Sequence, residues 1–131
     1  MARVLIADDS ILSRRIITKI ATENGHTVAG ESSNGVETIS KYKELKPDIV
    51  TMDITMPVMD GIECLKELIE YDSTAKVLIV SAIGKGSMVL EALKHGAKYY
   101  VTKPIDEKRV LDGINITLAD NNPPPDKDAF Y

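Results

Sequence analysis

Short apolar runs alternate along this chain with longer segments that have helical spacing. The runs are rich in Val and Ile and lie at residues 3–7, 27–30, 48–52, 77–80 and 99–101. In the segments between and after them, apolar residues recur every three or four positions; these segments lie at about 10–24, 35–45, 61–71, 86–95 and 106–119. Alternation of this kind indicates repeated βαβ units, in which helices cover both faces of a parallel sheet.

The length of the chain decides how such units close. At 131 residues it has the size of one domain, and a closed eight-stranded barrel needs far more chain. We therefore predict an α/β fold with an open, doubly wound, flavodoxin-like parallel sheet of order 2-1-3-4-5 and five helices. Residues 1–119 form this domain, and residues 120–131, which are polar and Pro-rich, form a flexible tail. Alternatively, the tail prolines form a docking ligand anchored by Phe130 and Tyr131.

Composition narrows the classes of partner. A net charge of −4 argues against nonspecific binding to nucleic acid. No apolar run approaches the roughly 18 residues of a membrane span, and the start of the chain lacks a signal-peptide pattern. The single cysteine, Cys64, excludes an internal disulfide and suits a reducing cytoplasm. We interpret Cys64 as a small apolar residue on a helix face.

Residues capable of chemistry stand where the predicted strands end. Asp8 and Asp9 follow the first run, Asp53 follows the third, and Ser81 and Lys103 follow the fourth and fifth. The carboxyl ends of parallel strands meet at one edge of the sheet, so these side chains should share a crevice. Like-charged carboxylates ~4 Å apart repel by roughly 4 kcal/mol at an effective dielectric of 20, which one lysine cannot offset. The pattern therefore predicts a site for Mg²⁺, which prefers oxygen ligands, and for phosphoryl transfer.

These residues occur within four motifs, ADDS, DITMPVMDG, SAIGKG and VTKPI. In their order and spacing they resemble the receiver domain of two-component response regulators, over residues 1–119. Within that family the pattern is most similar to the stand-alone chemotaxis regulators. The resemblance implies a signalling phosphoprotein and no enzyme, apart from assistance to its own phosphotransfer and dephosphorylation.

The resemblance also implies roles for the acids. Asp53 would accept a phosphoryl group from a histidine kinase or a small phosphodonor. Asp9 and Asp53 would bind Mg²⁺ together with the backbone carbonyl of Thr55, and Asp8 would act through a metal-bound water.

Four more residues receive roles in the same way. Lys103 would pair with the phosphoryl group, and the Lys103–Pro104 bond would be cis. Ser81 would bond a phosphoryl oxygen and Tyr100 would swing inward behind it, whereas Tyr99 would face the opposite side of the strand. Ile83, with Thr55, would tune hydrolysis of the acyl phosphate.

Phosphorylation would then change the surface made by the fourth helix, the fifth strand and the fifth helix. Lys85, Lys94 and Lys98 are expected to give that surface an exposed basic rim for an acidic partner. A component of the flagellar motor switch is the leading candidate, with a separate phosphatase as a further partner. We expect a cytoplasmic monomer.

Other interpretations remain open. Asp8 and Asp9 could cap the first helix, and Lys103 could be a surface residue. The chain could be the receiver of a truncated multidomain regulator, or a phosphorelay intermediate. A Mg²⁺-dependent aspartyl-phosphate phosphohydrolase would need a second acid at position 55, which is Thr55. A flavodoxin-type electron carrier would need a phosphate cradle where this chain has acids.

Overall fold

The computed structural model describes residues 1–126 and shows five strands alternating with five helices. Their order is β1 (Arg3–Ala7), α1 (Ile11–Glu23), β2 (Thr27–Ser32), α2 (Gly35–Leu45), β3 (Ile49–Met52), α3 (Gly61–Tyr71), β4 (Val77–Ser81), α4 (Gly86–Lys94), β5 (Tyr99–Thr102) and α5 (Glu107–Ala119). All strand pairs are parallel, and the sheet order is β2-β1-β3-β4-β5. The predicted fold class and strand order are confirmed.

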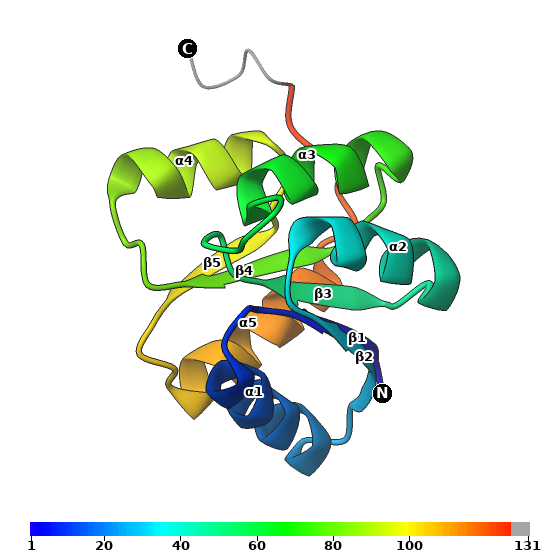
Figure 1. Cartoon of the computed structure of the whole chain (residues 1–131), viewed down its shortest axis with the longest axis vertical. Helices are drawn as coiled ribbons and strands as arrows, with labels where there is room; N and C mark the ends of the chain where they lie inside the picture. The colour runs from blue at the N-terminus through cyan, green and yellow to red at the C-terminus, as the bar shows by residue number, and fades with distance from the viewer. Residues whose placement is uncertain (127–131) are drawn as a thin grey trace.

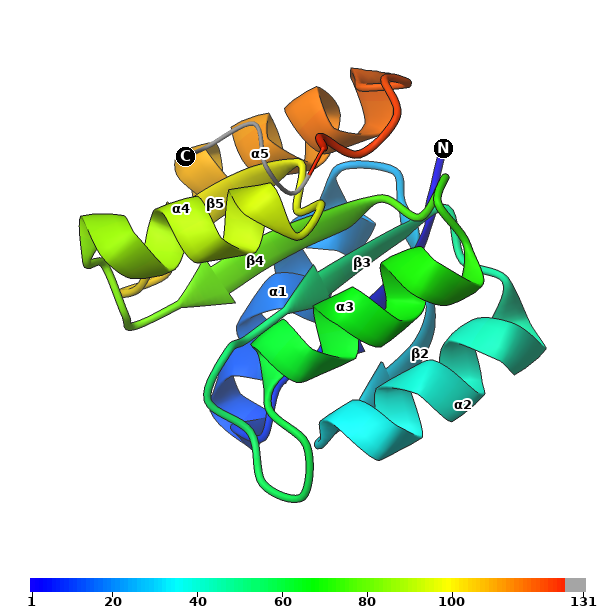
Figure 2. The same ribbon diagram turned by 90° about the horizontal axis from the view of Figure 1, so that it is seen from above.

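The sheet forms the middle of three layers. Helices α1 and α5 cover one face, and α2, α3 and α4 cover the other (Figures 1 and 2). Neighbouring residues of one strand pack into the hydrophobic cores on opposite faces of the sheet: Ile49 packs toward α1 and α5, and Val50 packs toward α2 and α3. Burial on both faces explains why the central strands are continuous apolar runs.

Four of the helices begin at a residue whose side chain caps them. Ser10, Asn34, Asp60 and Asp106 each accept a hydrogen bond from the backbone N–H three residues later. Such caps stabilise a helix by typically about 1 kcal/mol. Helix α4 is different, because Lys85 at its cap position makes no capping hydrogen bond. Its first turn is therefore held less firmly than those of the other helices.

The helical spacing of residues 10–24 predicts one buried apolar face that includes Leu12 and Ile16, and this prediction is wrong in part. Leu12 and Ile16 are 68% and 38% exposed, and α1 buries only Ile17, Ile20 and Ala21. Residues four apart drift by about 40° around a helix, so Leu12 and Ile16 have turned away from the stripe that faces the sheet.

The predicted exposed basic rim is also wrong in part, because only Lys85 is exposed and Lys94 is half-buried. The Lys98 side chain is only 6% exposed, and its ammonium contacts Asp120 at 3.5 Å. The chain beyond α5 folds back over this lysine, which the pattern of the fourth helix could not indicate.

The structure describes only part of the predicted C-terminal tail. The predicted tail lies within the described residues up to 126, whereas Phe130 and Tyr131 lie outside them.

His26 Nδ1 accepts a hydrogen bond from the Ala2 N–H at 3.2 Å, and His95 Nε2 lies 3.0 Å from Glu91 Oε1. In the described part of the chain, no helix has the length and apolar character needed to cross a membrane.

Candidate functional site

The carboxyl ends of four strands bring the predicted polar residues to one edge of the sheet. Lys103 Nζ lies 2.9 Å from Asp8 Oδ2 and 3.1 Å from Asp53 Oδ2. One carboxylate oxygen from each of Asp8, Asp9 and Asp53 lies within 4.8 Å of the others. Three acids from the ends of β1 and β3 thus surround one position, with a lysine from the end of β5 beside them. An oxygen-rich cluster of this kind suits a hard divalent cation such as Mg²⁺.

The three acids differ in their exposure to water. Asp8 and Asp53 are 1% and 6% exposed, whereas Asp9 is exposed. Burial raises the pKa of Asp8, and this effect outweighs the contacts with Lys103 and the Ser10 N–H that lower it. For Lys103 burial has the opposite effect and lowers the pKa. The hydrogen bonds to Asp8 and Asp53 outweigh this effect, so the pKa of Lys103 is raised overall. Lys103 therefore stays charged, and the cluster keeps an excess of negative charge.

Backbone contacts fix the loops that carry these acids. The Asp53 N–H donates to the Ala7 carbonyl at 2.9 Å, and the Gly61 N–H donates to the Ile54 carbonyl at 2.7 Å. A Cβ atom on Gly61 would lie 2.1 Å from the Asp53 carbonyl oxygen. The loop after β3 can therefore fold this tightly only because residue 61 has no side chain.

Arg14 is a residue of the site that the sequence did not reveal. Its Nη1 donates to the Asp8 carbonyl at 2.6 Å, and its Nε bonds Glu31 Oε1 at 3.0 Å. The arginine therefore ties the acid-bearing loop to α1 and β2. Its position one turn into the helix was the only available signal, and many surface arginines share it.

The loop after β4 links the two proposed switch residues through Ile83. Ser81 is fully buried, and its Oγ accepts a hydrogen bond from the Ile83 N–H at 3.2 Å. The Tyr100 hydroxyl donates to the Ile83 carbonyl. Tyr100 packs against the core beneath α3 and α4, whereas Tyr99 is 38% exposed. The opposite orientation of the two tyrosines agrees with the alternation of a strand.

The structure places the remaining predicted residues without testing their roles. Thr55 is exposed, and its N–H donates to Asp53 Oδ1 at 3.4 Å. The metal-binding role of its carbonyl stays a prediction. Ile83 is half-buried against the same core as Tyr100, and its effect on hydrolysis stays a prediction as well. The Lys103–Pro104 peptide bond is cis, as the resemblance implied.

Comparisons with known proteins agree with this geometry. The model of the response regulator receiver domain matches residues 4–115. The chemotaxis protein CheY of Thermotoga maritima is 51% identical over 86% of this chain and 94% of that protein. CheY of Bacillus subtilis is 48% identical over 88% of this chain and 97% of that protein. A solved structure, the CheX-CheY-BeF3-Mg+2 complex from Borrelia burgdorferi, has a TM-score of 0.88 and 40% identity, with 90% of each chain covered.

The chain therefore belongs to the response regulator receiver domain family. Several of its relatives are CheY proteins, and it is a CheY-like receiver. Members of this family are signalling proteins of two-component systems rather than classical enzymes.

Proposed function

We propose that this protein is a phosphorylation-activated response regulator in which Asp53 accepts a phosphoryl group from a histidine kinase. The observation that carries the proposal is the position of Asp53, whose Oδ2 lies 3.1 Å from the Lys103 ammonium at the centre of the acidic cluster. The same ammonium can stabilise negative charge on a transferred phosphoryl group.

Asp9 and Asp53, with the Thr55 carbonyl, would hold Mg²⁺ directly, and Asp8 would hold it through water. The clustered carboxylate oxygens fit this ion. When bound, Mg²⁺ would neutralise the acids and the phosphoryl oxygens. Lys103 would orient the phosphoryl group, and Ser81 would donate a hydrogen bond to it after giving up its bond to Ile83.

The exchange of the Ser81 hydrogen bond from Ile83 to the phosphoryl group would couple the site to the surface of the domain. If Ser81 Oγ turns toward Asp53, the Ile83 N–H loses its acceptor and the loop before α4 must move. The Ile83 carbonyl also accepts the hydrogen bond of the Tyr100 hydroxyl, so the half-buried Tyr100 would be freed to swing further inward. The weakly capped α4, β5 and α5 would then present a changed surface to an output partner.

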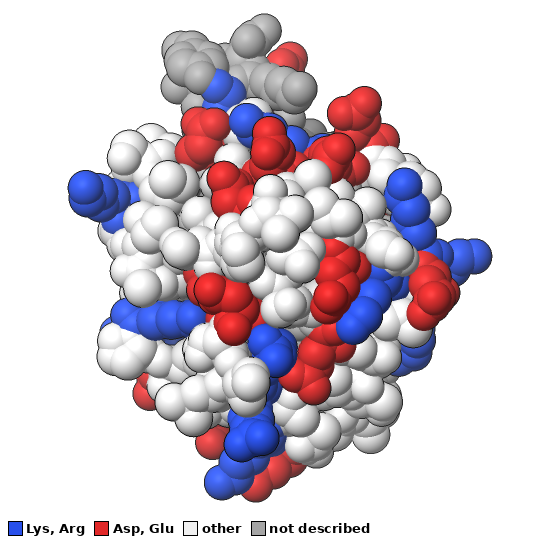
Figure 3. All heavy atoms as spheres, viewed as in Figure 1, with Lys and Arg blue, Asp and Glu red and all other residues white. Residues whose placement is uncertain are grey.

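Two of the relatives are chemotaxis proteins, which supports a role in chemotaxis, with a flagellar motor switch component as the output partner. The relative in complex with CheX supports a separate phosphatase or output protein as a further partner. Thr55 and Ile83 would set the rate of spontaneous hydrolysis. We propose a cytoplasmic monomer that does not bind nucleic acid. The net charge of −4 supports the last point, and on the face shown in Figure 3 basic and acidic side chains are interspersed.

A second candidate is the receiver of a larger regulator. Residues of this chain are 44% identical to part of a protein-glutamate methylesterase of Bacillus licheniformis, of which they cover 30%. Receivers of this sequence type therefore also occur joined to further domains. A gene product that continues past Tyr131 into an effector domain would favour this candidate.

Intact-mass measurement after treatment with acetyl phosphate and Mg²⁺ tests the proposal. We expect one phosphoryl addition on the wild type, lost on Asp53→Asn and on removal of the metal. Asp60→Asn is the matched control, because Asp60 caps α3 outside the acidic cluster. Equal labelling of Asp53→Asn and wild type would refute the assignment of Asp53.

A further inference from the structure

Arg14 joins the loop that carries two of the acids to a helix and a strand. The Arg14 side chain is only 17% exposed, and its Nη1 donates to the Asp8 carbonyl at 2.6 Å. Its Nε donates to Glu31 Oε1 on β2 at 3.0 Å. The Arg14 N–H donates to the carbonyl of Ser10, the N-cap residue of α1, at 3.0 Å. The first turn of α1 thus fixes the base of the side chain, and β2 fixes its guanidinium.

The oxygen that Arg14 contacts belongs to the peptide group between Asp8 and Asp9. That group is planar, so a contact that holds its oxygen also fixes the direction in which the chain enters Asp9. The preceding peptide group is held as well, because the Asp8 N–H donates to the Ser32 carbonyl of β2 at 3.0 Å. Arg14 and β2 therefore control the backbone on both sides of the Asp8 Cα atom.

Asp9 depends on this backbone for its position. It is exposed, and among residues 1–126 no group donates a hydrogen bond to its carboxylate. Asp8 differs, because the Ser10 N–H and the Lys103 ammonium each hold one of its oxygens at 2.9 Å. Contacts that orient metal ligands typically change metal affinity by roughly 10- to 100-fold. For Asp9 the contact able to do this is the one made to the backbone.

We propose that Arg14 is a positioning residue for Mg²⁺, which acts by holding Asp9 in the direction of the ion, and that Glu31 orients Arg14 in turn. This inference rests on the proposed function, because Asp9 is a metal ligand only if the acidic cluster binds Mg²⁺. The charge of Arg14 alone would have the opposite effect, since a cation beside the site repels Mg²⁺. Positioning and charge therefore predict changes of opposite sign when Arg14 is replaced by a neutral residue.

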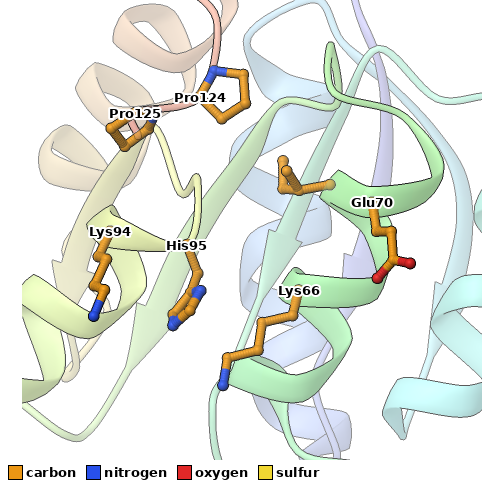
Figure 4. Close-up of a pocket in the computed structure, with 7 residues that line it drawn as sticks. Lys66, Glu70, Lys94, His95, Pro124 and Pro125 are labelled. Carbon is orange, nitrogen blue, oxygen red and sulfur yellow. The ribbon is translucent and has the colours of Figure 1, made fainter. Parts of the chain in front are cut away.

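Arg14→Gln removes the contact, and two variants control for the loss of one positive charge. Arg15→Gln removes the charge of the neighbouring residue on the same helix, where Arg15 is exposed. Lys66→Gln removes a charge from α3 on the other face of the sheet, where the Lys66 side chain lines a cavity together with His95 (Figure 4).

Titration with Mg²⁺ alone, followed by the amide NMR signals of residues 8–10 and 53–55, measures the affinity. We expect Arg14→Gln to bind Mg²⁺ roughly 10-fold more weakly than wild type. Arg15→Gln and Lys66→Gln should bind it as tightly as wild type or slightly more tightly. Binding by Arg14→Gln that is at least as tight as that of wild type would overturn the inference, because the arginine would then act through its charge alone.

A double-mutant cycle separates positioning of Asp9 from general support of the loop. If Arg14 acts through Asp9, the loss of affinity caused by Arg14→Gln should disappear once Asp9→Asn has removed the carboxylate. An equal loss in the Asp9→Asn background would overturn the inference, because the arginine would then support the site without acting on Asp9.

A second pair of variants leaves Arg14 in place and tests the inference even if Arg14→Gln does not fold. Glu31→Gln loses the charge but keeps an oxygen that can accept from Arg14 Nε, whereas Glu31→Ala loses both. Glu31→Ala should bind Mg²⁺ roughly 2 to 10 times more weakly than Glu31→Gln, which corresponds to the loss of one hydrogen bond. Equal affinities would overturn the inference, because the bond that orients Arg14 would then have no effect on the metal.

In each of these negative outcomes wild type would still bind Mg²⁺, and the proposed function would stand. Failure of wild type to bind Mg²⁺ at all would refute the metal site of the proposed function, and the positioning role of Arg14 with it.

Discussion

Two glycines at equivalent helix positions should respond in opposite ways to replacement by alanine. Gly61 and Gly86 are the first residues of α3 and α4, and neither has a positive φ. A Cβ atom at Gly61 would lie 2.1 Å from the Asp53 carbonyl oxygen and 2.7 Å from Ile54 Cα. A Cβ atom at Gly86 would meet no atom of the described residues within 4 Å. Gly86→Ala thus isolates the helix-propensity gain, and Gly61→Ala adds a clash with backbone atoms.

The magnitudes follow from those distances. Alanine in place of glycine stabilises a protein by about 0.4–1 kcal/mol where the backbone conformation suits both residues, and this is the expected gain for Gly86→Ala. Overpacking costs typically about 1–3 kcal/mol, and the cost at Gly61 should reach at least the upper part of that range because backbone atoms cannot rotate away. After subtraction of the propensity gain, we expect Gly61→Ala to lose about 2 kcal/mol or more. The two variants should therefore differ by about 3 kcal/mol in their free energy of unfolding.

Urea unfolding followed by far-ultraviolet circular dichroism measures this difference. The midpoint should rise for Gly86→Ala and fall for Gly61→Ala, with similar slopes. Gly61→Ala should also slow phosphorylation, because the displaced peptide group belongs to Asp53. Equal stability of the two variants would refute the argument that the loop after β3 requires a residue without a side chain.

Three further predictions concern single side chains. Cys64 is fully buried, and burial raises its pKa to about 12, so iodoacetamide at pH 8 should label it only after unfolding in urea; complete labelling of the native protein would contradict its placement. Lys103→Met leaves the acids without their ammonium, so Mg²⁺ should raise the thermal midpoint of this variant more than that of wild type; equal shifts would contradict the charge balance. Hydrogen bonds lower the pKa of Asp72 from 3.8; the bond from the Thr74 side chain has the largest effect, and another comes from Tyr42. Their stabilising effect is therefore present above about pH 4 and is lost as the pH falls through the folded-state pKa, so Thr74→Ala should destabilise at pH 7 and match wild type at the lowest pH; an equal deficit at both pH values would contradict this.

The strand order and the convergence of the acids could be predicted from the sequence because both follow from topology. Parallel strands buried on both faces are continuous apolar runs, and these runs located the ends of β1 and β3 to within a residue. Once the ends were located, the rule that ligands bind at the carboxyl edge of the sheet placed Asp8 near Asp53. The contacts of Lys103 with both acids agree with that rule.

Contacts between side chains distant in the sequence could not be predicted in the same way. Lys98 follows a helix and precedes a strand, so its pattern is that of a surface lysine, and only the return of residues 120–122 buries it. Arg14 resembles any charged residue on the first turn of a helix, and its bond to the Asp8 carbonyl depends on one side-chain conformation. Leu12 fits a helical period, but the drift of that period decides whether it faces the sheet.

The three acids differ in how many of their carboxylate oxygens already accept hydrogen bonds, and the spacing of the residues could not predict this difference. Both oxygens of Asp8 are already engaged, because Oδ1 accepts from the Ser10 N–H at 2.9 Å and Oδ2 accepts from Lys103. An ionised carboxylate has about four lone-pair sites, so these two bonds orient Asp8 and leave sites that could accept a hydrogen bond from a metal-bound water, as proposed. Asp9 is exposed and therefore keeps its oxygens available to an incoming ion. Asp53 lies between these extremes: Lys103 holds its Oδ2, while its Oδ1 accepts only a long hydrogen bond from the Thr55 N–H, at 3.4 Å. Under the proposed function, the weakly bonded Oδ1 is the oxygen that would be available to a metal ion or to phosphorus, so a single lysine could hold Asp53 in place and leave its second oxygen free to react.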